Sequence, residues 1–315
     1  MFGYLEVDIL GMNIPFLKYR KIYFAISGIL VLASVIFLIL FGLNLGVDFV
    51  GGSLLEVEFK DKRPEISEIQ EKLSPLNLGR LSIQFTNEKG IILTIKGKNI
   101  SESLKEEVVL KLAEINQLEE KSDGFEAISS VIGQELKSKT KIIIILCLVI
   151  IVFYIAFAFR QVSRPIASWQ YGLSSIFVLC HDVLIPLGIF SVLGKFYGAE
   201  INIPVICALL AIFGYSINNT VVVFDRVREH LLKKRDLTYE LAVDRALNET
   251  LIRCLNTSLT TLFVLFSMLF LVGKDLKYFS LILILGIVFG TWSSLFLVTP
   301  MLVSWLKWKE RKLSN

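Results

Sequence analysis

The sequence has few charged residues and lacks the motifs of the common enzyme classes. Asp, Glu, Lys and Arg make up only 20% of its 315 residues, whereas 54% are hydrophobic. This balance excludes an ordinary soluble globular protein and is typical of an integral membrane protein. The sequence contains no GxxxxGK[ST] phosphate-binding loop, no HExxH zinc motif and no GxSxG nucleophile motif. We therefore expect a membrane protein that is not an enzyme and that needs neither a metal nor a cofactor.

Cysteine is also scarce, and its placement excludes two further classes of protein. Cys147, Cys180, Cys207 and Cys254 all lie in apolar segments, and none has CxxC spacing. A disulfide framework or a zinc site is therefore not expected, and small core residues are the better interpretation. The N-terminus has no basic stretch followed at once by an apolar run, so we expect no cleaved signal peptide.

Six apolar segments are long enough to span a membrane, which takes about 20 mostly apolar residues. The last of them is also long enough to tilt or to kink near Pro300. The expected fold is an all-α membrane bundle, in which the first span is followed by a separate domain and then by five more spans in residues 141–306. The six segments are 22–43, 141–159, 170–193, 203–224, 251–272 and 278–306.

Residues 44–140, between the first two spans, have a different character and predict a folded domain. Alternating patterns at 53–59, 81–85 and 90–97 predict strands, and helical patterns occur at 66–73 and 102–115, with Ser101 as the candidate N-cap. A further strand is expected within 125–132. The order β-α-β-β-α-β predicts one inserted α+β domain of ferredoxin-like type.

The distribution of Lys and Arg predicts the orientation in the membrane. These residues gather before the first span, after the second and fourth spans, and after the sixth. The short loops on the other side hold only Lys195, Lys274 and Lys277. The positive-inside rule then predicts that segments 1–21 and 307–315 are cytoplasmic and that the α+β domain is extracytoplasmic.

Polar side chains interrupt the fourth span in the stretch GYSINNTVVVFDRVREH, residues 214–230. Helical spacing puts Ser216, Asn219 and Thr220 on one face. Polar groups in hydrocarbon turn to the bundle interior and pair there. The simpler interpretation is that Asn219 forms a structural hydrogen bond between helices, and the alternative is a site on a transport pathway.

Two more polar sites occur in neighbouring spans. Arg253 begins a stripe with Asn256, Thr257 and Thr260 near the start of the fifth span. Its guanidinium either reaches out to lipid headgroups or belongs to a pairing face that continues inward. His181 and Asp182 lie near the middle of the third span, where a structural hydrogen-bonded pair and a proton relay are both open interpretations.

Two motifs lie at the ends of spans. The run GVDFVGG after the first span contains Asp48, Gly51 and Gly52. The two glycines permit positive φ and a tight turn, so the segment is a candidate hinge, with Gly133 a second one. The run DRVRE contains Asp225 and Arg226, for which salt bridges to neighbouring loops are the simplest expectation.

Taken together, these motifs resemble the SecF family of bacterial translocon accessory subunits. The resemblance rests on GVDFVGGSLLEVEF, on HD in the third span, on GYSIN-x-TVVVFDRVRE with Gly214, Asn218 and Thr220, and on ETLIRCLNTSLTT in the fifth. The related SecD family carries a much larger extracytoplasmic region, and the GYSIN and HD motifs also fit SecF better. The resemblance extends over nearly the whole chain.

The resemblance implies a place in protein export. A SecF-like chain supplies half of a twelve-helix arrangement like that of the RND transporters, and a SecD-like subunit supplies the other half. The implied partners are that subunit, the SecYEG channel, exported unfolded polypeptides and membrane lipid, with no nucleic acid. The pair uses a proton or sodium gradient to promote late steps of export across the cytoplasmic membrane, and SecF hydrolyses no nucleotide.

The sequence departs from the family at one important position. The fourth-span motif usually reads IND, whose aspartate is thought to carry the proton and to pair with the fifth-span arginine, here Arg253. In this chain the matching residue is Asn219, which cannot ionise. The carrier has moved to Asp182 or to the SecD-like half, or coupling is lost, or the sequence is an engineered variant that imitates the protonated form. A scaffold that docks exported chains but moves no ions is therefore the alternative function.

Overall fold

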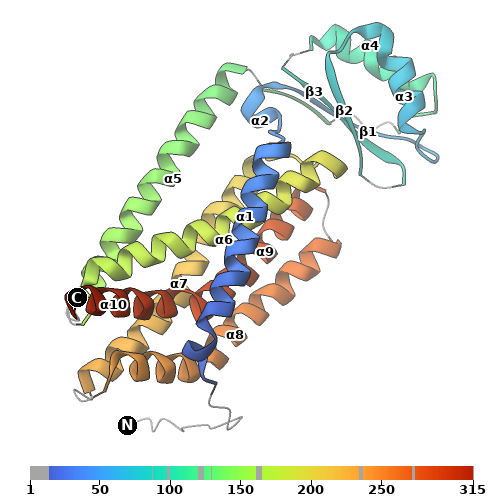
Figure 1. Ribbon diagram of the computed structural model, residues 1–315. Helices are drawn as coiled ribbons and strands as arrows, with labels where there is room; N and C mark the ends of the chain where they lie inside the picture. Colours follow the sequence, from blue (N-terminus) through green and yellow to red (C-terminus); the bar gives the residue numbers. More distant parts are fainter. Residues whose placement is uncertain are drawn as a thin grey trace, which may run out of the picture.

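The computed structural model of the chain describes residues 14–86, 88–97, 100–119, 124–128, 130–160, 165–233, 237–271 and 274–314. These residues form a helical bundle and a small α+β domain at one end of it (Figure 1). Most of the predicted cytoplasmic segment 1–21 and the charged residues at 161–164 and 234–236 lie outside the described residues.

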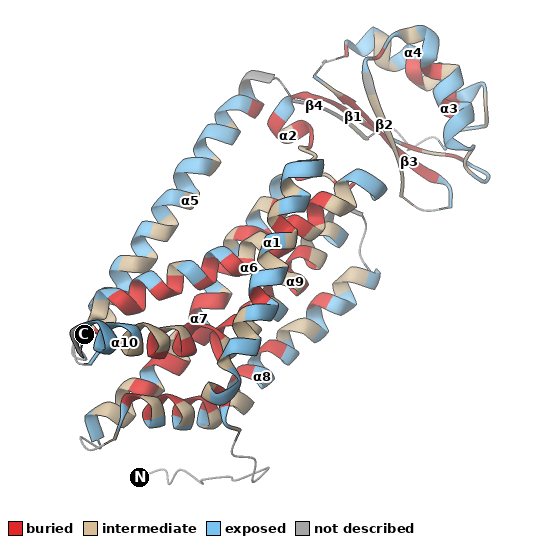
Figure 2. Cartoon of the chain, in the orientation of Figure 1, coloured by how far each residue is buried: buried red, intermediate tan, exposed pale blue. Residues whose placement is uncertain are grey.

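Six helices in the described part of the chain are long and apolar enough to cross a membrane, as the sequence predicted. The most buried of them are α6, α7 and α9, whereas α1, α5 and α8 expose much of their surface to what would be lipid or a partner (Figure 2). A short 3₁₀ helix, η1 (Phe16–Tyr19), precedes the first of them. The spans are α1 (Arg20–Phe41), α5 (Ser130–Ala158), α6 (Ser168–Tyr197), α7 (Ile203–Lys233), α8 (Tyr239–Leu271) and α9 (Lys274–Phe296).

The predicted ends of three spans were wrong, because the helices continue beyond their apolar parts. Helix α5 begins at Ser130, before the predicted start of the second span at residue 141. Its added turns carry an ion pair between Lys139 and Glu135 at 2.7 Å. Helix α7 ends at Lys233, not at 224, and α8 begins at Tyr239, not at 251. Pairs at i,i+3 and i,i+4 stabilise such polar turns, which hydropathy does not detect.

The sixth predicted span is divided at Leu297. Helix α9 ends at Phe296, and α10 (Val298–Ser314) follows it. Pro300 explains the break, because it has no N–H to donate to the carbonyl of Phe296 and its ring crowds that carbonyl. The kink expected near Pro300 is therefore present, but residues 298–306 belong to a separate helix.

The ferredoxin-like prediction for the inserted domain is confirmed. The sheet order is β2-β3-β1-β4, and all neighbouring strands are antiparallel. Helices α3 and α4 pack on one face around a core that includes Leu55, Leu93 and Ile69, and Ser101 caps α4 by accepting from Leu104 N. The elements are β1 (Gly52–Glu58), α3 (Ile66–Leu73), η2 (Ser74–Leu76), β2 (Arg80–Phe85), β3 (Gly90–Lys96), α4 (Glu102–Ala113) and β4 (Gly124–Ile128).

A tight glycine turn joins the bundle to the domain. The short helix α2 (Val47–Val50) ends at Gly51, which has φ +75°, and Gly52 follows with φ +142°. A side chain at Gly52 would overlap the carbonyl oxygen of Ile95, so only glycine fits there. Both glycines are buried. A Cβ added at Gly133 of α5 would lie 3.0 Å from the Phe49 carbonyl, so α5 packs closely on α2. A hinge at these positions stays a prediction.

Candidate functional site

A carboxyl group lies buried in the bundle, where α6, α7 and α9 meet. Asp182 of α6 is fully buried, with 0% of its surface exposed. Ser216 Oγ of α7 and Ser293 Oγ of α9 donate hydrogen bonds to its Oδ2 at 2.5 and 2.8 Å. His181 Nδ1 lies 2.8 Å from its Oδ1. Three helices therefore converge on one ionisable side chain, which could not be kept in hydrocarbon without such partners.

The neighbouring imidazole has one nitrogen left over. His181 is only 4% exposed, and its Nε2 has no hydrogen-bond partner among the described residues. The ring edge faces Phe289 at a centroid distance of 6.4 Å. Because Nδ1 is engaged by Asp182, Nε2 is the atom through which this pair can exchange a proton with an incoming group.

A second set of polar contacts continues along α7 and α9. Asn219 is 1% exposed, and its Nδ2 donates to Ser258 Oγ of α8 at 3.5 Å and to Thr291 Oγ1 of α9 at 3.4 Å. The Thr220 hydroxyl lies 3.0 Å from the hydroxyl of Ser294. Asn219 therefore makes the interhelical hydrogen bonds that the simpler interpretation predicted.

Close packing of α9 holds these contacts together. A Cβ at Gly286 would overlap the side chain of Ile212 on α7, and a Cβ at Gly290 would lie 3.3 Å from Ser216 Cβ and 3.5 Å from Asp182 Oδ2. Small residues four apart let membrane helices approach closely. We call the whole set the polar seam: Asp182, Ser216, Asn219, Thr220, Ser258, Thr291, Ser293 and Ser294.

The sequence interpretation missed the contribution of α9 to the seam. Thr291, Ser293 and Ser294 were not singled out, although the stretch GIVFGTWSS carries a small-xxx-small signal that could have identified the face. The fifth span contributes only Ser258 to the seam.

Arg253 lies at the outer edge of the α7–α8 contact, where it lines a cavity together with the seam residue Asn219. The Arg253 side chain is exposed, as are those of Asn256, Thr257 and Thr260. The Thr257 and Thr260 hydroxyls donate to carbonyls of their own helix. The exposed residues of this stripe therefore do not enter the seam itself, and a pairing face between Arg253 and the fourth span stays a prediction. The cause is helical phase, since Cys254 and Ser258 occupy the inner face of α8.

Arg253 nevertheless lies beside the asparagine pair. Together with Asn218, Asn219 and Thr257 it lines a small open cavity of about 50 Å³ between α7 and α8, which has room for a few water molecules. No ion pair or hydrogen bond joins the Arg253 guanidinium to another residue in the described part of the chain. Gly214 is exposed on the same helix as Asn218, and a Cβ there would meet nothing within 4 Å.

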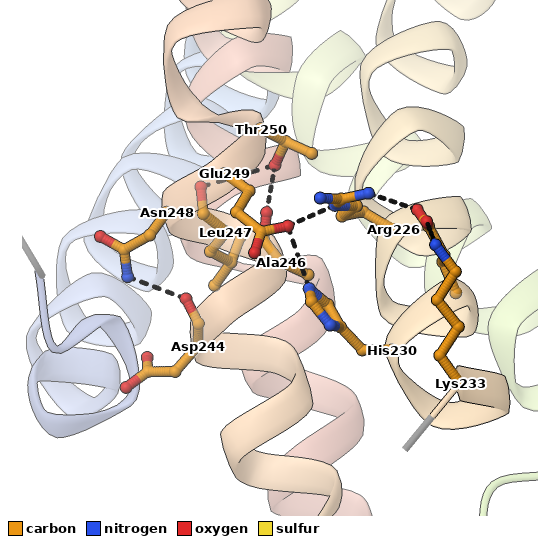
Figure 3. A network of polar contacts seen from close by, with 10 residues as sticks. Arg226, His230, Lys233, Asp244, Ala246, Leu247, Asn248, Glu249 and Thr250 are labelled. Carbon is orange, nitrogen blue, oxygen red and sulfur yellow. Dashed lines mark hydrogen bonds and ion pairs between the residues drawn. The ribbon is translucent and has the colours of Figure 1, made fainter. Parts of the chain in front are cut away.

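The DRVRE motif stabilises the polar end of the α7–α8 pair (Figure 3). Arg226 bonds to Glu229 of its own helix and to Glu249 of α8. His230 Nε2 lies 3.0 Å from Glu249 Oε2, and Asp225 lies 3.8 Å from Arg228. The expected partners in neighbouring loops are thus corrected: the motif binds the next helix, because α7 and α8 both continue past the membrane-spanning stretch.

The GVD motif connects two distant parts of the chain. Asp48 Oδ2 accepts a hydrogen bond from Ile203 N at 2.8 Å, at the first residue of α7. Lys96 Nζ of β3 donates to Asn44 Oδ1 and to Leu45 O, each at 2.7 Å, and lies 3.0 Å from Glu200 Oε1. Asp48 therefore has a capping role, and the Lys96 contacts fasten the domain to the loop before α7.

The cysteines and the acidic residues offer no metal site. The described residues contain no group of three or more His, Cys, Asp or Glu side chains that could hold a metal ion. All four cysteines are free. The expectation that they fill the core is wrong for Cys180 and Cys207, which are exposed on the outside of this chain.

Comparison with known proteins identifies two family regions. Residues 107–308 match the model of the C-terminal part of the SecD/SecF protein export membrane proteins, and residues 36–62 match the SecD/SecF GG motif. The second region includes Gly51 and Gly52.

Individual relatives agree with the family match. The chain is 35% identical to the protein translocase subunit SecF of Thermobaculum terrenum, with 93% of this chain and 94% of that protein covered. It is 34% identical to SecF of Petrotoga mobilis over 95% of this chain and 98% of that one. The crystal structure of the translocon-associated membrane protein SecDF from Thermus thermophilus matches with a TM-score of 0.82 at 30% identity. That match covers 96% of this chain, which spans only 40% of the SecDF chain.

Proposed function

The chain belongs to the SecD/SecF family of protein-export membrane proteins, and on that premise we propose that it is a SecF-like subunit of the Sec export machinery. It pairs with a SecD-like subunit, works with the SecYEG channel and uses a proton or sodium gradient to promote late steps of protein export. The observation that carries the proposal is Asp182, an ionisable group buried where α6, α7 and α9 meet.

The proposed orientation places both termini in the cytoplasm and the ferredoxin-like domain on the outside of the cytoplasmic membrane. The excess of Lys and Arg at the bundle end remote from the domain supports it. Helix α10 and η1 lie near that end (Figure 1). The domain is then available to exported chains as they leave the channel.

The SecD-like partner would cover the outer face of α7 and α8. This face carries Asn218, Arg253 and Asn256 beside the small residue Gly214. An uncovered guanidinium in a spanning helix is costly, and small residues allow a second helix to approach closely. A partner helix that brings a carboxylate to the cavity would satisfy Arg253.

In this proposal the His181–Asp182 pair carries the proton that couples the gradient to export. Asn219 occupies the position of the usual aspartate and cannot carry a proton, whereas Asp182 can. Its three polar partners stabilise the carboxylate, and the buried Nε2 of His181, which has no partner among the described residues, is the nitrogen left to accept a proton. A change in the charge of Asp182 then alters how α6, α7 and α9 pack along the polar seam.

A scaffold that moves no ions is the second candidate. The observation that favours it is Asn219, whose amide is already satisfied by Ser258 and Thr291, so that the seam also works as a purely structural feature. In that case the domain docks exported chains, and the bundle only stabilises the translocon.

The test is gradient-dependent export by the complex of this chain, a SecD-like partner and SecYEG in proteoliposomes. We expect Asp182→Asn to reduce export to the rate seen without a gradient, because the only buried carboxyl of the seam is lost. Asn219→Asp should preserve or increase gradient-dependent export. The matched control is Asp61→Asn, the same change at an exposed position of the domain.

The two candidate functions give different outcomes in that assay. Ion coupling also predicts that the wild-type complex conducts protons or sodium while an unfolded substrate is present, and that Asp182→Asn stops the current. An Asp182→Asn complex that assembles normally and exports at the full gradient-dependent rate would remove the coupling role and leave the scaffold. Clear loss of export in Asn219→Asp would show that this chain does not use that position as its relatives do.

A further inference from the structure

Helix α10 (Val298–Ser314) runs in a different direction from α9. The break at Leu297 and Pro300 separates the two helices. Figure 1 shows α10 running across the bundle toward the ends of α5 and α6, instead of continuing along the direction of α9. A helix that only prolonged the sixth span would point away from the membrane, and α10 does not.

Contacts with α6 fix the level of α10 along the bundle. The Trp305 ring meets the Trp169 ring edge-on, with centroids 5.5 Å apart. Trp169 is the second residue of α6, and the adjacent Ser168 donates to Phe159 O at the end of α5 at 2.9 Å. Two spans therefore end beside α10, which places the helix at the boundary of the membrane rather than within it or far outside it.

The two sides of α10 differ in chemistry. Leu302 and Val303 are buried against the bundle. On the opposite side Trp308 is 61% exposed, and Lys312 Nζ lies 5.5 Å from the centre of its ring. Lys309 and Arg311 are also exposed. Lys307 is paired with Glu240 of α8 at 2.6 Å.

This composition fits the headgroup layer of a membrane and not open water. A large indole ring gains little from exposure to water, whereas Trp is favoured at the membrane interface. Lys and Arg beside it attract anionic headgroups, and such a helix binds through its apolar area and its charge together. In the sequence of this half of the helix, Glu310 stands among Lys309, Arg311 and Lys312, so the segment carries a net positive charge.

We propose that the outer half of α10 is an anionic phospholipid site, in which Trp308 enters the headgroup layer and Lys309 and Lys312 bind lipid phosphates. The occupant is a lipid rather than a soluble anion, because the cations flank an exposed ring that needs an apolar surface. The site depends on membrane embedding and on α10 alone, so it stands whether or not the bundle couples ions.

Amide hydrogen exchange of the full chain in nanodiscs tests the site. One set of discs contains phosphatidylcholine only, and the other contains phosphatidylcholine and phosphatidylglycerol in equal parts. We expect the amides of α10 to exchange more slowly in the phosphatidylglycerol discs and to lose this protection at high salt. Lys309→Gln with Lys312→Gln should weaken the protection by an order of magnitude or more, since each cation near the surface contributes about fivefold.

Controls separate the lipid site from other causes. Lys60→Gln with Lys62→Gln removes the same charge from exposed positions of the domain and should leave the protection unchanged. Trp308→Ala should reduce protection in both kinds of disc, because an indole does not distinguish headgroup charge. Equal exchange in the two lipid compositions would overturn the proposal. So would protection that survives the loss of Lys309 and Lys312, or protection produced by inorganic phosphate in phosphatidylcholine discs.

Discussion

At the scale of single residues, two glycines in facing helices have opposite surroundings. Gly286 of α9 has Ile212 of α7 where a Cβ would be, whereas Gly214 of α7 has nothing within 4 Å. The first glycine permits the contact that closes the polar seam. The second lies on the outer face beside Asn218, where only a partner chain could require it to be small.

We expect Gly286→Ala to destabilise the purified chain by about 1–3 kcal/mol, because Ile212 is β-branched and must leave its rotamer. Gly214→Ala is the matched control and should leave the chain alone as stable as the wild type or up to about 1 kcal/mol more stable, because Ala favours a helix over Gly. In the complex with a SecD-like partner, Gly214→Ala should weaken assembly. Thermal unfolding of the chain and co-purification of the complex measure the two effects. Equal stability of both variants would mean that α7 and α9 do not pack as closely as described.

The sequence identified some of the seam residues and not others, for a physical reason. His181, Asp182 and Asn219 stand out because an unpaired charge or amide is costly in hydrocarbon. Thr291 and Ser294 do not, because their hydroxyls also donate to carbonyls of their own helix, Ile287 O at 2.7 Å and Gly290 O at 2.8 Å. Because such a hydroxyl can form its hydrogen bond within its own helix, the sequence does not show which neighbouring helix it contacts.

At the scale of helices and strands, the apolar pattern predicted which elements exist and did not predict where they end. All six spans were found, but α7 and α8 continue through charged turns that Arg226 and Glu249 join. The outward direction of Arg253 was equally hidden, because both faces of α8 carry polar residues and only packing decides which is inside.

Lys96 provides a test of how the domain is fastened to the bundle. Its ammonium lies in a largely buried setting between Asn44, Leu45 and Glu200. We expect Lys96→Met to destabilise the chain by about 1.5–3 kcal/mol, since the hydrogen bonds of a largely buried charge to Asn44 and Leu45 are lost. Amide exchange should increase in residues 44–50 and 198–202.

The matched control for that change is Lys72→Met. Lys72 pairs with Glu114 at 2.8 Å, but both side chains are largely exposed, at 41% and 50%. Water screens exposed pairs, which contribute little to stability, so this variant should unfold almost like the wild type. If Lys96→Met also unfolded like the wild type, the Lys96 contacts would not contribute to holding the domain on the bundle.

At the scale of the whole molecule, the inserted domain was predicted better than its attachment. Alternation of apolar residues and one clear N-cap specified the ferredoxin-like order, because each strand and helix has its own local signal. The attachment joins residues far apart in the sequence, such as Gln84 Nε2 to Gly198 O at 3.1 Å and Asp48 to Ile203. No local pattern encodes such contacts, so only the folded chain reveals them.

These attachments bear on whether the domain moves during export. The domain meets the bundle at the Gly51–Gly52 turn, at the α2–α5 contact around Gly133, and at Lys96. If a change at Asp182 drives the domain, the motion must pass through the turn and through the α2–α5 contact. The exposed residues Val50 and Ile132 lie on α2 and α5 and offer sites for a link between them.

We therefore expect a cross-link between Val50→Cys and Ile132→Cys to block gradient-dependent export. The four native cysteines are first changed to Ser, because Cys180 and Cys207 are exposed and would react. A bifunctional thiol reagent with a reducible bridge closes the link, and export by the complex is measured before closure, after closure and after reduction. Export should fall to the rate seen without a gradient and recover when the bridge is cut, and each single-cysteine variant should be unaffected by the reagent. A fully cross-linked complex that still exports at the gradient-dependent rate would show that the domain keeps one position on the bundle throughout the cycle.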